Sequence, residues 1–284
     1  MLIAKTIKHA KKIINEAKLK SKIIGFVPTM GALHGGHLSL VRAAKKDCGF
    51  VVVSIFVNPT QFGPKEDFKK YPRVFSRDRE MLQKEKVDLI FSPSVAEMYG
   101  KDFSSYVEET RLSKYLCGRA RPGHFRGVCT VVAKLFNIIT PDAAYFGQKD
   151  YQQAQIIRRM VEDLNFPITV KVLPTIREPD GLAMSSRNAY LNSKDRKDSL
   201  VLLESLKLAE RLIKEGEQDT KKVVNKLRKF ILSKKSAKID YIAIVDAGSL
   251  QPVSKIQKKV LVALAVYIGK TRLIDNVVIH LKEN

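Results

Sequence analysis

The sequence predicts an α/β protein, with a Rossmann-like parallel sheet that has helices on both faces and a smaller C-terminal α+β domain. From residue 23 to residue 173, short apolar runs alternate with stretches of helical apolar spacing, which is the pattern of a parallel sheet wrapped by helices. After about residue 176 the pattern changes to two long amphipathic helices and two further apolar runs. No apolar run approaches the roughly 18 residues of a membrane span, so we expect no membrane partner.

The expected elements follow in order along the chain. The basic stretch at 5–22 has the composition of a transit peptide, but Ile7, Ala10 and Ile14 recur at helical spacing and favour a first helix. Short apolar runs then predict strands at 23–27, 50–57, 87–91, 143–146 and 168–173, and helical periods predict helices at 38–48, 74–86, 128–139 and 151–164.

The smaller domain is expected from amphipathic helices at 194–215 and 220–234 and from strands near 239–245 and 260–268. A Pro/Gly-marked loop that carries Ser185 and Ser186 joins it to the first domain. We therefore expect a Rossmann-like domain at 1–175 and a smaller α+β lid domain at 176–284, which closes over a ligand.

The net charge of +22 makes nucleic acid a partner to consider. The excess is mostly lysine, spread over predicted helix faces without interleaved aromatic residues, which favours solvated helix faces and, through its positive field, small anionic substrates. Cys48, Cys117 and Cys129 lack metal-ligand spacing and are typical of reduced residues in a cytosolic protein. An RNA-binding protein that uses the basic surface stays an alternative.

The most informative motif is the glycine-rich turn Pro28 to His37, which sets His34 and His37 three residues apart. It follows an apolar run and precedes a helical pattern, so we expect it to connect a strand to the start of a helix. Backbone N–H groups and the helix dipole gather anions at such a position, and imidazoles there can donate to phosphate oxygens. Helix capping is the alternative for either histidine alone.

Polar motifs follow three other expected strands. They lie at 58–63, at 147–150, and at 178–181 together with 184–187. Because ligands bind at the carboxyl ends of parallel strands, we expect these motifs to form one site.

Several of these side chains suit a phosphorylated ligand. The ammonium of Lys149 and the guanidinium of Arg187 can hold phosphate oxygens, helped by the hydroxyls of Ser185 and Ser186. Gln61 is an uncharged donor and acceptor in a Pro/Gly-rich loop, which suits a hydroxyl or a carboxylate.

Two motifs have a structural alternative. Asp150 and Gln153 have the spacing of a helix cap with its reciprocal partner, although Gln153 can instead turn its amide toward a substrate. The segment Arg121 to Gly127 supplies two cations and His124, or simply a turn. There is no Ser-His-Asp order, zinc spacing, P-loop lysine signature or Gly-x-Gly-x-x-Gly in the sequence, which disfavours hydrolases, zinc enzymes, P-loop kinases and dehydrogenases, and no metal-ligating residue is expected.

Taken together, the motifs resemble the pantothenate synthetase family, whose members join pantoate and β-alanine, within the nucleotidyltransferases that share a His-x-Gly-His turn. The resemblance is carried by Pro-Thr-Met-Gly-Ala-Leu-His-Gly-Gly-His at 28–37, Phe-Val-Asn-Pro-Thr-Gln-Phe at 56–62, Arg-Pro-Gly-His-Phe-Arg-Gly-Val at 121–128, Phe-Gly-Gln-Lys-Asp-Tyr-Gln-Gln at 146–153, Met-Ser-Ser-Arg-Asn at 184–188 and Thr-Arg-Leu-Ile-Asp-Asn at 271–276. These blocks are collinear over nearly the whole chain.

The resemblance implies roles for particular residues. His37 would be the proton donor, Gln61 and Gln153 would bind pantoate, and His34, Lys149 and Arg187 would join His37 in stabilising the transition state. The ATP site would comprise Met30, Gly31, Ala32, Leu33, His34, Gly35, Gly36, His37, Gly147, Gln148, Lys149, Asp150, Ile176, Met184, Ser185, Ser186 and Arg187. The family often has Glu where this chain has Gln148, which removes a charge beside the lysine without touching it.

The implied reaction uses ATP and Mg²⁺ to convert pantoate to pantoyl adenylate, which the amine of β-alanine attacks to give pantothenate and AMP. The family is usually a homodimer that assembles through its nucleotide-binding domain. We expect a cytoplasmic protein, in keeping with the reduced cysteines, and no nucleic-acid partner. A nucleotidyltransferase of the same superfamily with a different acceptor is the other alternative.

Overall fold

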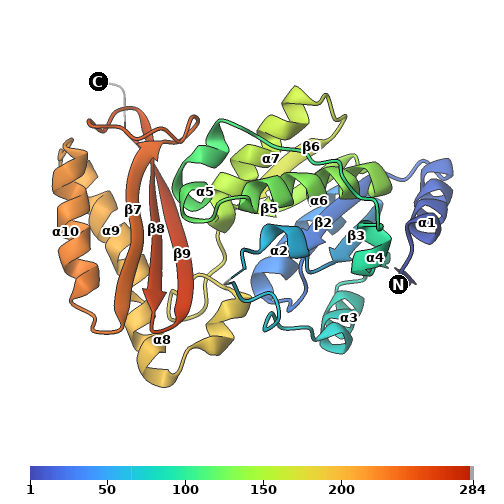
Figure 1. The fold of residues 1–284 in the computed structure, drawn as a ribbon, viewed down its shortest axis with the longest axis horizontal. Coiled ribbons are helices and arrows are strands. Elements are labelled where there is room, and N and C mark those ends of the chain that lie inside the picture. The colour runs from blue at the N-terminus through green and yellow to red at the C-terminus, as the bar shows by residue number, and fades with distance from the viewer. Residues whose placement is uncertain (65, 282–284) are drawn as a thin grey trace. The chain divides into compact units, whose positions relative to one another are not determined.

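The computed structural model describes residues 1–64 and 66–281, which form two compact units. The first unit contains 1–110, 121–148 and 153–174, and the second contains 111–120, 149–152 and 175–284. Neither unit is therefore a single stretch of chain. Each unit contains one sheet (Figure 1).

The first unit is built on a six-stranded sheet in the order β1-β4-β3-β2-β5-β6. The strands are β1 (Leu2–Ala4), β2 (Ile24–Thr29), β3 (Phe50–Ile55), β4 (Leu89–Phe91), β5 (Ala143–Gly147) and β6 (Thr169–Leu173). All neighbouring pairs run parallel, and the central strands are apolar along nearly their whole length because side chains cover both faces. The predicted Rossmann-like parallel sheet is confirmed.

Helices cover both faces of this sheet. They are α1 (Ile7–Leu19), α2 (Gly35–Asp47), α3 (Phe75–Lys84), α4 (Val95–Met98), α6 (His124–Ile139) and α7 (Tyr151–Asp163), with short 3₁₀ turns η1 (Pro59–Gln61) and η3 (Gln148–Asp150). On one face, Val41 of α2 and Leu82 of α3 share a buried cluster with Val27 of β2. On the other face, the ring of Phe136 in α6 packs edge-on against Phe26 of β2, with 6.4 Å between the ring centroids.

Two details of this unit differ from the expectations. The short edge strand β1 was not expected, because it contains only three residues, which pair with β4. Helix α6 begins at His124 rather than at residue 128, since Gly123 adopts a left-handed φ of 80° and so ends the preceding turn. The segment Arg121 to Gly127 therefore comprises the end of a turn and the first residues of α6.

The second unit contains the three-stranded antiparallel sheet β7 (Ala237–Asp246), β8 (Lys259–Ile268) and β9 (Thr271–His280). Its helices are α5 (Leu116–Ala120), α8 (Ser193–Ser199), α9 (Val201–Lys214) and α10 (Thr220–Leu232), with 3₁₀ turns η2 (Leu112–Lys114) and η4 (Ser186–Tyr190). Alternate residues of β8 belong to two clusters, Val262 with α9 and α10, and Leu261 with Tyr115 and Tyr151. Both faces of β8 are thus covered, which explains its continuous apolar run and confirms the smaller α+β part of the fold.

The elements of this unit also depart from the expected boundaries. The expected helix at 194–215 is two helices, α8 and α9, which meet at Leu200. Strand β9 was not expected, since Asp275 and Asn276 interrupt its apolar pattern, yet both side chains are buried.

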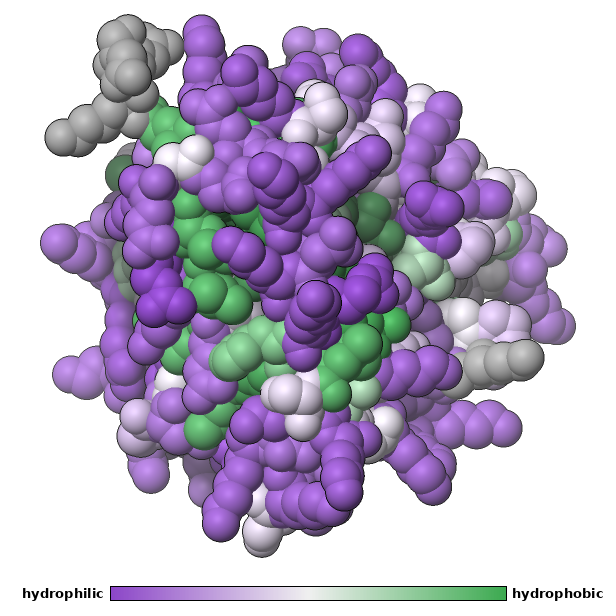
Figure 2. Space-filling model, turned by 90° about the vertical axis from the view of Figure 1, so that its left-hand side faces the viewer, coloured by the Kyte–Doolittle hydropathy of each residue, from purple (hydrophilic) through white to green (hydrophobic). Residues whose placement is uncertain are grey.

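Lysines and arginines occupy the outer face of α10. The exposed basic residues of this helix are Lys221, Lys222, Lys226, Arg228 and Lys229. Figure 2 views the side of the molecule on which α9 and α10 lie, and it shows hydrophilic side chains over most of that surface with apolar ones between them. Within 1–64 and 66–281, no helix has the length and apolar character to cross a bilayer.

Candidate active site

The strand order of the first unit locates its candidate residues. β2 lies between β3 and β5, so the chain proceeds to one side of β2 through β3 and β4 and returns to its other side with β5. In open α/β sheets, ligands bind outside the carboxyl ends of the strands at such a switch point. The predicted segments Met30 to His37 and Gly147 to Gln148 lie at the carboxyl ends of β2 and β5, the two strands that flank it.

The two histidines form a reciprocal cap at the start of α2. His34 is the N-cap residue, its Nδ1 accepts the N–H of Gly36 at 3.2 Å, and Nδ1 of His37 accepts the N–H of His34 at 3.4 Å. Their rings lie 4.1 Å apart between centroids. Because Nδ1 accepts in both rings, the proton of each neutral imidazole is on Nε2. Each histidine can therefore cap the helix through Nδ1 and still donate a hydrogen bond to a ligand through Nε2.

Asp78 contacts this turn from another helix, and sequence reasoning missed it. It lies on α3, is only 1% exposed, and accepts the N–H of Ala32 at 2.9 Å and the N–H of Leu33 at 2.8 Å. Burial raises the pKa of its carboxyl above the ordinary value, against the opposing effect of the two N–H groups. Nothing in the sequence around Asp78 distinguishes it from a surface carboxylate on a polar helix.

Gln61 lies beside Met30 at the carboxyl end of β3. Its Nε2 lies 3.0 Å from the Met30 sulfur, and its Oε1 accepts from Nδ2 of Asn58 at 3.2 Å. Asn58 is 1% exposed, and it also donates to the carbonyl of Gly127 and accepts from the hydroxyl of Tyr99. The predicted pantoate residue is thus oriented by a buried amide that the sequence did not single out as a functional residue.

The residues Arg121 and His124 support this loop. Nδ1 of His124 donates to the carbonyl of Gln61 at 2.8 Å, while the guanidinium of Arg121 donates to Nε2 of the same ring at 3.1 Å. Arg121 also forms a bidentate ion pair with Glu66, which holds the pKa of that carboxyl below its ordinary value despite burial. These contacts support the structural alternative for this motif rather than a set of ligand-binding cations.

We expect Gly127→Ala to destabilise the first unit by about 3 kcal/mol, because a Cβ atom there would lie 2.3 Å from the carbonyl oxygen of Thr60 and 2.7 Å from the amide nitrogen of Gln61. Denaturant unfolding measures the loss. The matched control is Gly100→Ala, whose Cβ would have no atom within 4 Å. Equal stability of the two variants would show that α6 and η1 separate without cost.

The predicted residues on either side of Lys149 are partly or fully exposed. Gly147 ends β5, and a Cβ there would meet no atom within 4 Å, so there is open space at this strand end. Gln148 and Gln153 are both half-buried. Asp150 directly precedes α7, the position expected for a cap.

Lys149 belongs to the second unit. Its Nζ donates to the carbonyl of Met184 at 2.9 Å, and its own carbonyl accepts from Nδ2 of Asn276 at 2.8 Å. Burial lowers the pKa of its ammonium, Asp150 and Asp275 oppose this, and Arg187 adds to it. The structure thus brings Lys149 together with the loop Met184 to Arg187, as the sequence predicted for these two motifs.

The loop itself is held by hydrogen bonds within the same unit. The amide of Met184 donates to the carbonyl of Ile176 at 3.0 Å, and Ser185 caps η4 by accepting the N–H of Arg187. Ile176 is 38% exposed, and the side chains of Ser185, Ser186 and Arg187 are half-buried. These residues are therefore accessible to a ligand.

An ion-pair network of Arg196, Glu178 and Asp180 stabilises the loop that contains Met184 to Arg187. The guanidinium of Arg196 donates to Glu178 at 3.0 Å and to Asp180 at 2.6 Å, and Glu178 accepts from Nδ2 of Asn188 at 2.7 Å. The hydrogen bond from Arg196 lowers the pKa of Glu178.

We expect Arg196→Met to lower the free energy of unfolding by about 1 kcal/mol at pH 7. Since Arg196 lowers the folded-state pKa of Glu178, its stabilisation is present above the unfolded carboxyl pKa of about 4.3 and is lost as the pH falls through the folded value. Urea unfolding of both proteins from pH 7 to pH 3 measures the difference. A difference that stays constant with pH would contradict this explanation.

The described part of the chain contains no group of three or more His, Cys, Asp or Glu side chains that could hold a metal ion.

Comparison with known proteins identifies the family. The family profile described as Pantoate-beta-alanine ligase matches residues 2–278. Pantothenate synthetases of Thermotoga petrophila and Thermotoga neapolitana are 59% and 58% identical over 279 residues, which cover 98% of this chain and 100% of each relative.

Solved structures agree with this. The pantothenate synthetase of Thermus thermophilus has a TM-score of 0.92 at 44% identity, covering 98% of this chain and 99% of that one. The Francisella tularensis pantoate-beta-alanine ligase, described as complexed with beta-gamma ATP and beta-alanine, has a TM-score of 0.80 at 38% identity over 98% and 97% of the two chains. The chain therefore belongs to the pantoate-beta-alanine ligase family.

Proposed function

We propose that this enzyme joins pantoate and β-alanine to form pantothenate in two steps, with ATP as the activating substrate and pantoyl adenylate as the bound intermediate. The observation that carries the proposal is the reciprocally capped histidine pair at the switch point of a parallel sheet, in a chain that matches the family from residue 2 to residue 278. The Francisella relative bound to beta-gamma ATP and beta-alanine supports the choice of nucleotide and amine.

In the first step a carboxylate oxygen of pantoate attacks the α-phosphorus of ATP. The bond from that phosphorus to the bridging oxygen of the β-phosphate breaks, and pyrophosphate leaves with the electron pair. The carboxylate is ionised at neutral pH, so this step requires no base. What the protein must supply is positive charge and hydrogen-bond donors where negative charge accumulates.

Four side chains supply these groups in our proposal. His34, His37, Lys149 and Arg187 stabilise the charge on the phosphate oxygens, and the protons that both imidazoles carry on Nε2 suit them for donation. The residues proposed to bind ATP are Met30 to His37, Gly147 to Asp150, Ile176 and Met184 to Arg187. Mg²⁺ enters with ATP as its phosphate complex, in keeping with a chain whose described residues offer no metal-binding cluster.

Pantoate is bound in our proposal by Gln61 and Gln153. The amide of Gln61 is pre-oriented by Asn58, so that it is held in place before the substrate arrives. The neighbouring Gln152 is 6% exposed and uses its amide to bind the carbonyls of Leu112 and Tyr115 and the N–H of Cys117, which removes it as a ligand candidate.

In the second step the neutral amine of β-alanine attacks the acyl carbon of pantoyl adenylate. The acyl carbon to phosphate oxygen bond breaks, AMP leaves with the electron pair, and the amine nitrogen loses a proton to solvent as the amide forms. We further propose that the enzyme is a cytoplasmic homodimer with no nucleic-acid partner; sedimentation of the purified protein tests the dimer.

Incubation with ATP, Mg²⁺ and pantoate but no amine tests the proposal. We expect pantoate-dependent release of one pyrophosphate per site and a bound pantoyl adenylate by mass spectrometry, with AMP appearing only after β-alanine is added. Pyrophosphate release that does not depend on pantoate would favour another nucleotidyltransferase. Salt-sensitive RNA binding without ATP turnover would favour the RNA-binding alternative.

A further inference from the structure

The turn that carries the two histidines has an unfavourable backbone. Gly31 has a φ of 79° and Ala32 a φ of 49°, directly before Leu33 and the helix cap His34. A left-handed conformation costs a residue with a side chain about 1 kcal/mol, so contacts outside the turn must hold it.

Asp78 makes those contacts. Its two carboxylate oxygens accept the consecutive N–H groups of Ala32 and Leu33 at 2.9 and 2.8 Å. The fit is close, because a Cβ atom on Gly31 would lie 2.9 Å from Oδ2 of Asp78. The carboxylate therefore fixes both the conformation of the turn and its distance from α3.

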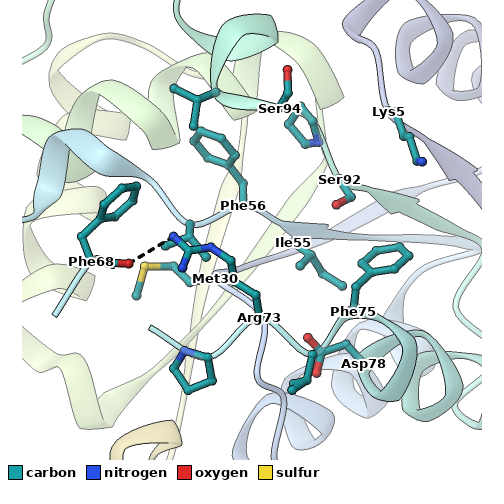
Figure 3. Close-up of a pocket in the computed structure, with 16 residues that line it drawn as sticks. Lys5, Met30, Ile55, Phe56, Phe68, Arg73, Phe75, Asp78, Ser92 and Ser94 are labelled. Carbon is teal, nitrogen blue, oxygen red and sulfur yellow. Dashed lines mark hydrogen bonds between the residues drawn. The ribbon is translucent and has the colours of Figure 1, made fainter. Parts of the chain in front are cut away.

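The surroundings of Asp78 are largely apolar. It lines a pocket of about 420 Å³ that is also lined by the apolar side chains of Phe75, Ile55 and Phe56 (Figure 3). Figure 3 shows Met30 and Arg73 at the centre of this view and Lys5 at its far edge.

The cations near this pocket do not neutralise the carboxylate. Arg73 donates to the carbonyls of Phe68 and Tyr71, and within 1–64 and 66–281 no ion pair to Asp78 is formed. Arg77, the adjacent cation on α3, only partly offsets the effect of burial on the pKa of Asp78. A buried carboxylate without an ion pair is costly to maintain, and its two backbone partners are what it stabilises.

We propose that Asp78 is a positioning residue for the nucleotide site, acting by holding the Ala32 and Leu33 amides so that His34 and His37 face the phosphates. The inference rests on the proposed function, because it assigns the histidines their ligand. A purely structural role predicts loss of stability with no specific change in the handling of ATP.

The chain offers a matched control for this distinction. Asp88 also accepts a backbone N–H, that of Val51 at 2.8 Å, and it pairs with Lys45 at 2.9 Å. Asp88 lies just before β4, at the amino ends of the parallel strands, whereas the histidine turn lies at their carboxyl ends. Asp78→Asn and Asp88→Asn therefore each weaken a carboxylate contact to the backbone of one unit, but only the first disturbs the turn.

The experiment measures pantoate-dependent pyrophosphate release, ATP affinity by calorimetry, and thermal unfolding for both variants. For Asp78→Asn we expect kcat/KM for ATP to fall about 10- to 100-fold, with KM for pantoate changed less than about threefold. For Asp88→Asn we expect both constants to stay within twofold of the wild type. Asp78→Glu, which keeps the charge but lengthens the side chain, is the second variant if Asp78→Asn fails to fold.

Equal kinetic losses in the Asp78 and Asp88 variants, or wild-type kcat/KM in a folded Asp78 variant, would overturn the inference. Absence of pantoate-dependent pyrophosphate release from the wild type would instead overturn the proposed function. Calorimetry would then still decide the role of Asp78, since the inference requires at least tenfold weaker ATP binding in the variant.

Discussion

Lys149→Ala is expected to lower the rate of pantoate-dependent pyrophosphate release by about 10²- to 10³-fold, the usual cost of losing one preorganised donor to a transition-state charge. Lys149 is the ammonium beside the loop Met184 to Arg187, and burial lowers its pKa. A partly desolvated charge interacts more strongly with a phosphate than a solvated one. Single-turnover measurement with saturating ATP separates this loss from weaker substrate binding.

The contact from Nζ to the Met184 carbonyl gives Lys149 a structural role as well. Lys149→Met keeps the apolar stem and removes the charge, so we expect it to be as slow as Lys149→Ala although more stable. The control is Lys214→Ala, which removes an exposed lysine of α9 that pairs with Glu210. Turnover within tenfold of the wild type in Lys149→Met would exclude the ammonium from the mechanism.

His37→Ala is expected to cause a loss of the same size, about 10²- to 10³-fold in kcat. Its Nδ1 caps the helix and its Nε2 carries the proton, so alanine removes two interactions at once. Pyrophosphate release again measures the effect, and His9→Ala on the exposed side of α1 is the control.

Two further variants separate the roles of the two nitrogens. Asn at position 37 places its amide near the position of Nδ1 and keeps the capping acceptor, whereas Gln reaches the position of Nε2 and keeps a donor there. We expect His37→Gln to retain more activity than His37→Asn, and His37→Asn to retain more stability. The reverse order of activity would mean that the ring acts chiefly as a cap.

The sequence predicted those parts of the fold whose apolar residues follow one clear pattern. Apolar runs such as Phe50 to Ile55 are buried on both faces and can hardly be anything but central strands. Strand β9 gave no such signal, because Asp275 is buried against Arg177 and Asn276 against the Lys149 carbonyl, so polar residues occupy interior positions. These two side chains can be buried because Arg177 and the Lys149 carbonyl, which are distant in sequence, bind them.

The same distinction applies to the candidate site. Residues in unusual local sequences, such as His34, Gln61 and Lys149, were predictable from glycine, proline and strand ends. Asp78 and Asn58 were not, although both are 1% exposed and hold the predicted residues in place. Their partners lie on other elements, at Ala32 and Leu33 for one and at Gly127 for the other, and no local pattern records such a pairing.

The reciprocal cap between His34 and His37 also sets how much the length of the motif can vary. The contact joins the N-cap residue to the third residue of the helix, and each added residue turns the chain by about 100° and advances it by about 1.5 Å. An insertion or deletion between the two histidines would carry the second ring to another side of α2 and break both hydrogen bonds. The number of residues between the histidines is therefore as constrained as their identity.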